Sequence, residues 1–198
     1  MAMRLKVLGL AGSPRRHGNT ELLLDQVLAG AASKGALIEK VVLSTLTMGP
    51  CDECEACYET GRCIVQDDYQ LLYPKLIKAE RVVLAAPIFF MGLPAQAKAF
   101  IDRCQCFWAR KYVLEDPLPP TDTGAQRQGY LVSTAGGPKT SFQCAARSMK
   151  AFLDALDGTY GGELTFRGVD EKAAILNHPS ALEEALALGK KLAVVEKE

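Results

Sequence analysis

The segment 12–20, GSPRRHGNT, combines glycine, hydroxyl and amide side chains with two arginines. An apolar run precedes it and apolar residues at helical spacing follow it, so we expect a turn between a strand and a helix. Such a turn leaves backbone N–H groups unpaired at the positive end of the helix dipole, where a phosphate group binds well. Ser13, Asn19 and Thr20 add neutral donors, and the arginines supply positive charge. The segment therefore predicts a phosphate site.

A second group of chemically active residues is a run of cysteines with the spacing C-x2-C-x2-C-x5-C. Its members are Cys51, Cys54, Cys57 and Cys63. Three thiols at successive three-residue steps can surround one cube, and a short glycine-containing loop brings the fourth, which resembles the ligation of a [4Fe–4S] cluster. Zinc sites more often pair two C-x2-C knuckles across a long spacer, which this run lacks. We therefore predict a cluster, and a loop without metal is the alternative.

Three further cysteines lie outside this run. Cys104 and Cys106 stand two residues apart on an expected helix, so they should lie on different faces and form no ligand pair. Cys144 falls in the first turns of another expected helix. We expect all three to be buried structural thiols. Seven cysteines with four crowded together are typical of metal or redox ligands in a reducing cytosol rather than of disulfides, which predicts a cytoplasmic protein.

The composition gives no support to several classes of partner. The chain has 198 residues with 23 basic and 23 acidic side chains, so its charge gives no reason to expect nucleic acid or an anionic membrane. No apolar run approaches the roughly 20 residues that span a bilayer, and residues 1–5 show no signal peptide. A chain of this length is expected to form one domain, 1–198, with a sizeable core.

The elements that must position these residues alternate along the chain. Strands are expected at 4–11, 37–43, 82–86, 130–134 and 163–166, and helices at 20–34, 69–79, 94–110, 139–156 and 179–195. We expect Pro74 to interrupt or delay its helix, and the polar second strand to lie near a sheet edge. The Cys-rich loop 48–68 and the proline-containing excursion 112–128 lack periodicity and are expected to be irregular.

This alternation predicts an α/β fold: a flavodoxin-like, doubly wound, three-layer sandwich with a five-stranded parallel sheet in the order 2-1-3-4-5. Ligands of such sheets bind beyond the carboxyl ends of the strands, where loops 12–20, 87–93 and 133–138 are expected to meet. A planar ring could lie on the apolar second loop, and the third could wrap its far side. A phosphate at one loop and a flat ring over the other two describe FMN.

A plainer interpretation of these loops remains open. The glycines could serve only turns, and Phe89, Phe90 and Met91 could belong to the core. Other nucleotide-binding folds are less well supported, because the chain lacks both the G-x-G-x-x-G pattern and the Walker A lysine motif. This argues against a Rossmann dehydrogenase and against a nucleotide hydrolase.

Taken together, GSPRRHGNT, APIFFMGLPAQAKAFIDR and STAGG resemble the NAD(P)H-dependent FMN reductase family of flavodoxin-like proteins, and the cysteine run is most similar to its iron–sulfur flavoprotein branch. The resemblance covers nearly the whole chain and is weakest at 112–128. It implies FMN with its phosphate held by Ser13, Arg15, Asn19 and Thr20. It also implies a flavin ring contacted by Pro87, Ile88, Phe89, Phe90, Met91, Gly92, Ser133, Thr134, Ala135, Gly136 and Gly137. Members of the family are usually homodimers or homotetramers whose flavin lies near a subunit interface.

The resemblance implies an oxidoreductase that takes hydride from NAD(P)H onto the flavin and passes electrons to a small molecule or a redox protein. The flavin carries this chemistry, so no catalytic side chain is assigned. The alternative is an iron–sulfur flavoprotein that carries electrons from a ferredoxin-like donor without NAD(P)H turnover. A third interpretation is a redox sensor that uses the loop from Cys51 to Cys63 without turnover.

Overall fold

The computed structural model describes residues 3–194, which contain one parallel sheet of five strands in the order β2-β1-β3-β4-β5. The strands are β1 (Lys6–Ala11), β2 (Leu37–Val42), β3 (Arg81–Ala85), β4 (Arg127–Ala135) and β5 (Gly158–Arg167). The helices are α1 (Asn19–Ser33), α2 (Cys57–Thr60), α3 (Tyr69–Lys78), α4 (Ala95–Arg103), α5 (Gln105–Tyr112), α6 (Gln143–Ala155) and α7 (Ala181–Leu192), with 3-10 turns η1 (Leu43–Thr45) and η2 (Ala174–Asn177). The predicted fold class and strand order are confirmed.

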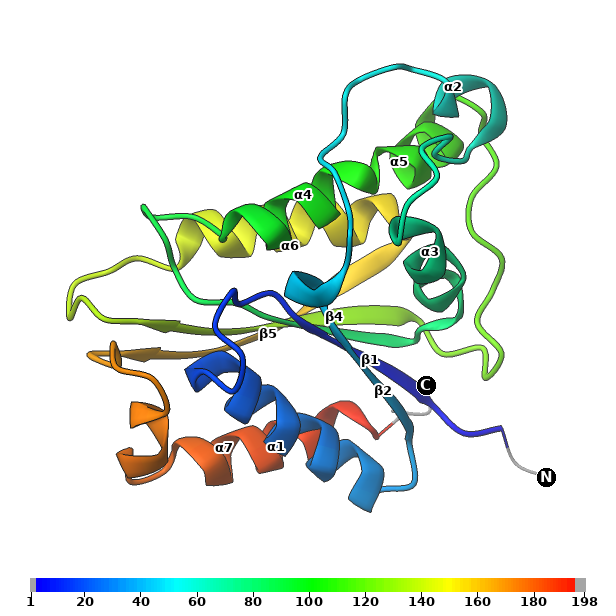
Figure 1. Cartoon of the computed structure of the whole chain (residues 1–198). Coiled ribbons are helices and arrows are strands. Elements are labelled where there is room, and N and C mark those ends of the chain that lie inside the picture. The colour runs from blue at the N-terminus through cyan, green and yellow to red at the C-terminus, as the bar shows by residue number, and fades with distance from the viewer. Residues whose placement is uncertain (1–2, 195–198) are drawn as a thin grey trace.

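Helices cover both faces of the sheet, with α1 and α7 on one face and α3 to α6 on the other (Figure 1). Successive side chains of a strand point to opposite faces, and the buried strands therefore supply two cores. In β3, Val82 and Leu84 belong to the core under α3 to α6, whereas Val83 and Ala85 belong to the core under α1 and α7. β2 forms one edge of the sheet and is largely exposed, as its polar sequence predicts.

Helices α1 and α7 approach each other closely because glycine stands on both sides of the contact. A Cβ atom added at Gly189 would lie 1.9 Å from the carbonyl oxygen of Val27, and one added at Gly30 would lie 2.2 Å from that of Leu186. No side chain fits at such distances. The position of α1, whose first turn faces the carboxyl edge of the sheet, therefore depends on this contact.

Three helix predictions and two strand predictions differ from the structure. The strand expected at 130–134 runs as β4 from Arg127 to Ala135. The helix expected at 94–110 is broken at Cys104 into α4 and α5. The helix expected at 139–156 begins only at Gln143, after a turn closed by the N–H of Thr140 on the carbonyl of Gly137. The expected helix 179–195 runs as α7 from Ala181, and its last residue lies outside the described residues. The strand expected at 163–166 is longer, because pairing with β4 extends it to Gly158–Arg167.

The predicted effect of Pro74 was wrong, because α3 is continuous through this residue from Tyr69 to Lys78. A proline inside a helix removes one backbone donor and crowds the preceding turn. Here Tyr69, Tyr73 and Leu76 are buried in the core and fix the helix on the sheet. Tertiary packing thus outweighs the local preference.

The excursion expected at 112–128 is irregular only between Tyr112, which ends α5, and Arg127, which begins β4, and a buried carboxylate attaches it to the sheet. Glu80 is fully buried and accepts hydrogen bonds from the N–H of Lys6 at 2.7 Å and from the N–H of Thr123 at 3.0 Å. The hydroxyl of Thr123 donates to the same carboxylate. These bonds hold the excursion at the amino end of β1 and β3, away from the carboxyl edge.

The two chemically active segments lie at different ends of the α4–α5 pair. In Figure 1 the loop between β3 and α4 lies at the carboxyl edge of the sheet, while α2 and the cysteine segment lie beside α5 at the other end. Because α4 and α5 connect these two places, the chain from Pro87 to Cys106 passes from one to the other.

Candidate functional site

A cavity opens at the carboxyl edge of the sheet, where the three predicted loops meet. It is lined by Ser13, Arg15, Gly18, Asn19, Thr20, Pro87, Ile88, Phe89, Thr134, Ala135, Gly136, Val169, Asp170 and Lys172. The loops are joined to one another directly, since the N–H of Ile88 donates to the carbonyl of Thr134 at 3.0 Å and the N–H of Gly12 to that of Ala85 at 2.8 Å. The structure therefore brings together segments that lie far apart in the sequence.

The turn that begins this cavity is shaped by Glu21, which is 1% exposed. Its carboxylate accepts a hydrogen bond from the N–H of His17 at 2.6 Å and is approached by Arg16 and Lys40. Burial raises the pKa of Glu21, but the bond from the His17 N–H and those from Arg16 and Lys40 outweigh it, so the pKa lies below its usual range. The ionised carboxylate therefore holds the turn closed and takes up the charge of Arg16.

Helix α1 begins at Asn19, directly after this turn. Gly18 occupies the N-cap position, and among residues 3–194 no side chain caps the first N–H groups. The uncapped groups and the positive end of the dipole suit an anion. Arg15 lines the cavity beside them, and Ser13 and Thr20 add hydroxyl groups to the lining.

Two of the predicted phosphate ligands also tie the turn to the segment after β5. Arg15 donates from Nη1 to the carbonyl of Asp170 at 2.9 Å. The side chain of Asn19 donates to the carbonyl of Glu171 at 2.9 Å and accepts from the N–H of Ile175 at 3.2 Å. Asn19 thus uses both ends of its amide to position the neighbouring loop.

The two loops predicted to contact a ring contribute unequally to the cavity. Pro87, Ile88 and Phe89 line it, whereas Phe90 and Met91 form the tip of a two-residue turn closed by mutual hydrogen bonds between Phe89 and Gly92. Both tip residues have positive φ, 46° and 65°, and both side chains are exposed. They therefore lie on the surface beside the cavity and not in the core.

The loop after β4 shows a similar division. Thr134, Ala135 and Gly136 line the cavity, while Ser133 is fully buried beneath it and donates to the carbonyl of Ala86 at 2.6 Å. Gly137 belongs to the following turn. Ser133 thus supports the loop after β3 from below.

Sequence reasoning missed the fourth wall of the cavity, formed by Val169, Asp170 and Lys172. The N–H of Val169 donates to the carbonyl of Ala135 at 3.1 Å, and a Cβ at Gly136 would lie only 2.8 Å from the Asp170 side chain. A signal was available, because these residues follow the fifth strand at the same edge as the other loops.

The cavity fits FMN on these observations. An uncapped helix start with arginine beside it suits the phosphate, and the lining combines backbone at Gly136 with the apolar Pro87–Phe89 segment. A flat, heteroatom-edged ring matches such a lining.

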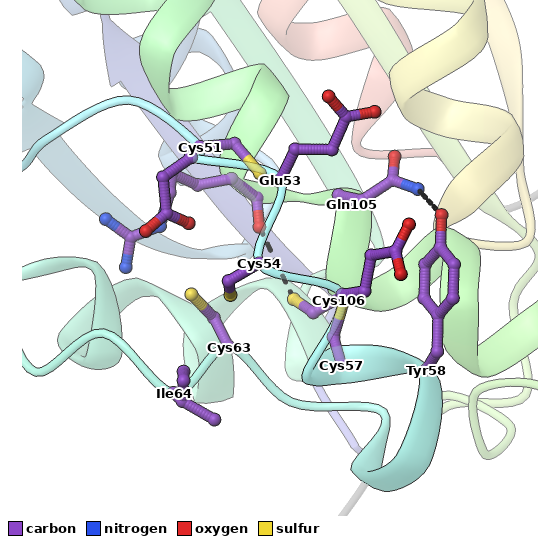
Figure 2. A pocket seen from close by; sticks show the side chains of 12 residues that line it. Cys51, Glu53, Cys54, Cys57, Tyr58, Cys63, Ile64, Gln105 and Cys106 are labelled. Atoms are coloured by element: carbon purple, nitrogen blue, oxygen red, sulfur yellow. Dashed lines mark hydrogen bonds between the residues drawn. The ribbon is translucent and has the colours of Figure 1, made fainter.

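The cysteine run forms a second cavity, shown in Figure 2. Its lining consists of Cys51, Asp52, Glu53, Cys54, Glu55, Cys57, Tyr58, Cys63, Ile64, Arg103, Gln105 and Cys106. All four predicted ligands are therefore on one cavity, and Cys54 is the exposed member. Sequence reasoning missed the contribution of α4 and α5, for which the cysteine spacing holds no signal.

The four thiols are close enough to affect one another. Burial raises the pKa of the Cys57 thiol, and the neighbouring Cys51, Cys54 and Cys63 raise it further. Among residues 3–194 no three His, Cys, Asp or Glu side chains already converge on one metal ion. A zinc site needs four thiolates at about 2.3 Å from a single ion, whereas a [4Fe–4S] cluster spreads its four thiolates over four irons. Four thiols on one cavity are the donor type that ligates a [4Fe–4S] cluster.

The remaining cysteines differ from the prediction in two respects. Cys104 and Cys106 are buried as expected, but both lie near the hydroxyl of Tyr69, at 3.6 Å and 3.4 Å, because the helix breaks at Cys104. Burial raises the pKa of Cys106 to about 11. Cys144, expected to be buried, is exposed in the first turn of α6.

Comparisons with known proteins agree with this geometry. A family profile of NADPH-dependent FMN reductases matches residues 5–167. An iron–sulfur flavoprotein of Methanocaldococcus jannaschii is 37% identical over 99 residues, 50% of this chain and 51% of that protein. One from Methanosarcina thermophila is 30% identical over 126 residues, 63% of this chain and 66% of that protein. The alignments thus span about half to two thirds of these relatives.

A solved structure supports the fold. An NAD(P)H:quinone oxidoreductase from Methanothermobacter marburgensis superposes with a TM-score of 0.72 at 16% identity, covering 98% of this chain and 100% of that one. In the described part of this chain, none of the helices has both the length and the apolar character required to cross a bilayer.

Proposed function

Because the chain belongs to the NADPH-dependent FMN reductase family, we propose that it is an FMN-dependent oxidoreductase that accepts hydride from NAD(P)H and delivers electrons to a second acceptor. The observation that carries the proposal is the cavity at the carboxyl edge, whose lining joins an uncapped helix start to a partly apolar wall. Bound FMN supplies the hydride and electron chemistry. The chain's own residues bind and orient it.

The residues around the cavity divide into two roles. The first turn of α1, with Arg15, Ser13 and Thr20, holds the phosphate, and Asn19 keeps the turn fixed against the loop after β5. Pro87–Phe89 and Thr134–Gly136 support the ring and meet its polar edge, while Phe90, Met91 and Gly92 flank it and Ser133 and Gly137 hold the two loops in place. No side chain has to move a proton in this scheme, so none is assigned as a catalytic acid or base.

Thr20→Val tests the phosphate role. Losing a hydrogen bond to a charged group weakens FMN binding by about 1.5–3 kcal/mol, roughly tenfold or more, while riboflavin, which has no phosphate, is affected much less. Flavin fluorescence titrations of both ligands measure this. Thr45→Val, in η1 outside the cavity, is the matched control. Equal losses for the two flavins would contradict the phosphate role.

We also propose a [4Fe–4S] cluster held by Cys51, Cys54, Cys57 and Cys63, supported by the one cavity that all four thiols line. Anaerobically prepared protein should be brown and contain about four irons per chain. Cys54→Ala should remove the brown absorbance and spare FMN binding, and Cys144→Ala, another exposed thiol, should change neither. Loss of FMN in Cys54→Ala would contradict the separation of the two sites.

A second candidate function is an electron carrier in which a ferredoxin-like donor reduces the cluster. The exposure of Cys54 favours it, because a protein donor could approach the cluster directly. Rapid bleaching of bound flavin by NAD(P)H would favour the enzyme, and its absence together with full iron content would favour the carrier. In either case the proposed assembly is a cytoplasmic homodimer or homotetramer of a single-domain chain, which light scattering would test.

A further inference from the structure

One buried cation lies on the wall of the cysteine cavity. Arg103, at the end of α4, is 1% exposed. Its guanidinium donates to the carboxylate of Asp67 at 2.6 Å and 3.1 Å, to the carbonyl of Gly49 at 3.1 Å and to that of Val65 at 3.4 Å. One side chain therefore fixes the backbone both before and after the cysteine run.

The hydrogen bonding of this guanidinium is incomplete in the described structure. Its Nε is buried and has no hydrogen-bond partner among residues 3–194. Arg103 and Cys63 line the same cavity, which brings a sulfur atom to the wall that Arg103 forms. A buried N–H without an acceptor is rare, and an anionic sulfur is an acceptor that would satisfy it. Arg127 also has an unpaired Nε, but no cysteine cavity adjoins it.

The charges around the cavity show why a cation is needed there. A cluster with four thiolates carries net negative charge, and Asp52, Glu53 and Glu55 on the same wall add to it. Arg103 is the only basic side chain among the described residues that line the cavity. Asp67 pairs with Arg103 and offsets part of its positive charge. The electrostatic potential at the cavity therefore depends on both side chains, which act in opposite directions.

We propose that Arg103 is a positioning residue and internal counter-charge for the cluster: it donates to the Cys63 sulfur, clamps both ends of the cysteine run and raises the reduction potential of the cluster, while Asp67 limits this effect. The inference rests on the proposed cluster. One-electron reduction makes the cluster more negative, and a nearby cation therefore favours the reduced form. Removing the cation should lower the potential, and removing its carboxylate partner should raise it.

The test is an anaerobic redox titration of the full-length holoprotein, followed by EPR of the reduced cluster, with iron content measured on each sample. We expect Arg103→Gln to shift the reduction equilibrium at least tenfold toward the oxidised form, about 59 mV for one electron, and Asp67→Asn to shift it the opposite way. Arg103→Lys keeps the charge but lacks the planar fork, so it should hold the potential near wild type while retaining less iron. Lys98→Gln, an exposed cation on the same helix, is the charge control.

The outcomes separate the inference from the proposed function. A role in packing alone would move both variants in the same direction or leave the potential unchanged, and either result in iron-loaded protein would overturn the inference while leaving the cluster assignment intact. If Arg103→Gln does not fold, the Asp67→Asn variant provides the test, because the proposal still requires it to raise the reduction potential of the cluster. Wild-type protein without iron after anaerobic reconstitution would overturn both.

Discussion

Replacing Glu21 with glutamine tests whether a buried carboxylate holds the phosphate turn. Glutamine keeps the shape and one acceptor oxygen but loses the charge. The carboxylate accepts from the His17 N–H at 2.6 Å and is approached by Lys40 at 3.2 Å and by Arg16 at 3.4 Å. All three contacts belong to the turn or to the strand beside it, so the substitution should loosen the turn without opening a cavity.

The size of the effect follows from these contacts. A hydrogen bond to a charged group contributes about 1.5–3 kcal/mol and a neutral one about 0.5–1.5 kcal/mol, so His17 alone accounts for about 1 kcal/mol. Lys40 adds little, because it also pairs with Asp25 at 2.7 Å and both are partly exposed. We expect Glu21→Gln to lower the free energy of unfolding by about 1–2 kcal/mol, and Tm by about 2–4 °C per kcal/mol.

The effect should also depend on pH. The folded-state pKa of Glu21 lies below its usual value of 4.5, so its contribution is fully present above that value and is lost as the pH falls through the folded-state pKa. Urea denaturation of the FMN-free protein at pH 7 and at successively lower pH measures this. The difference between wild type and Glu21→Gln should close on acidification. The exposed Glu39→Gln, which breaks only a surface pair with Lys75, should change stability by less than about 0.5 kcal/mol. A difference that widens at low pH would refute the reasoning.

Two further substitutions test the frame around the site. Gly189→Ala places a Cβ 1.9 Å from the carbonyl oxygen of Val27, so α1 and α7 must separate. The protein should lose about 3 kcal/mol of stability in chemical denaturation. An unchanged denaturation midpoint would show that the helices can shift freely. Met91→Gly relieves a positive φ of 65° at an exposed side chain. The free energy of unfolding, followed by Tm, should stay equal or rise by up to about 1 kcal/mol. A loss of stability would show that Met91 packs against another residue in the folded protein.

The sheet could be predicted because its strands carry a strong signal. β3 is apolar at nearly every position and is buried on both faces, so its place in the centre of a parallel sheet follows from composition. The break at Cys104 could not be predicted in this way. The segment from Ala95 to Tyr112 has no glycine and no internal proline, and the apolar spacing suits one helix. The break places two thiols near one tyrosine hydroxyl, a contact with α3 that sequence periodicity does not record.

The candidate site, like the fold, could be predicted from the sequence only in part. Loop 12–20 was recognisable because its glycines and small polar residues sit between a strand and a helix, and the structure places it on the cavity wall. The use of Asn19 to hold the backbone at Glu171 and Ile175 depends on contacts across more than 150 residues, with separations of 152 and 156. Such contacts form only when distant segments assemble at the edge of the sheet, and they leave no local pattern in the sequence.

The chain from Pro87 to Cys106 explains why two chemically different sites have a fixed relation in one small protein. Its first residues, Pro87–Phe89, line the edge cavity, and three near its end, Arg103, Gln105 and Cys106, line the cysteine cavity. Between them α4 has nine residues, a length of about 13 Å at 1.5 Å per residue. Because Phe100 and Ala97 in this helix are fully buried in the core, the helix acts as a rigid spacer. A change that shifts α4 along its axis must therefore disturb both sites together.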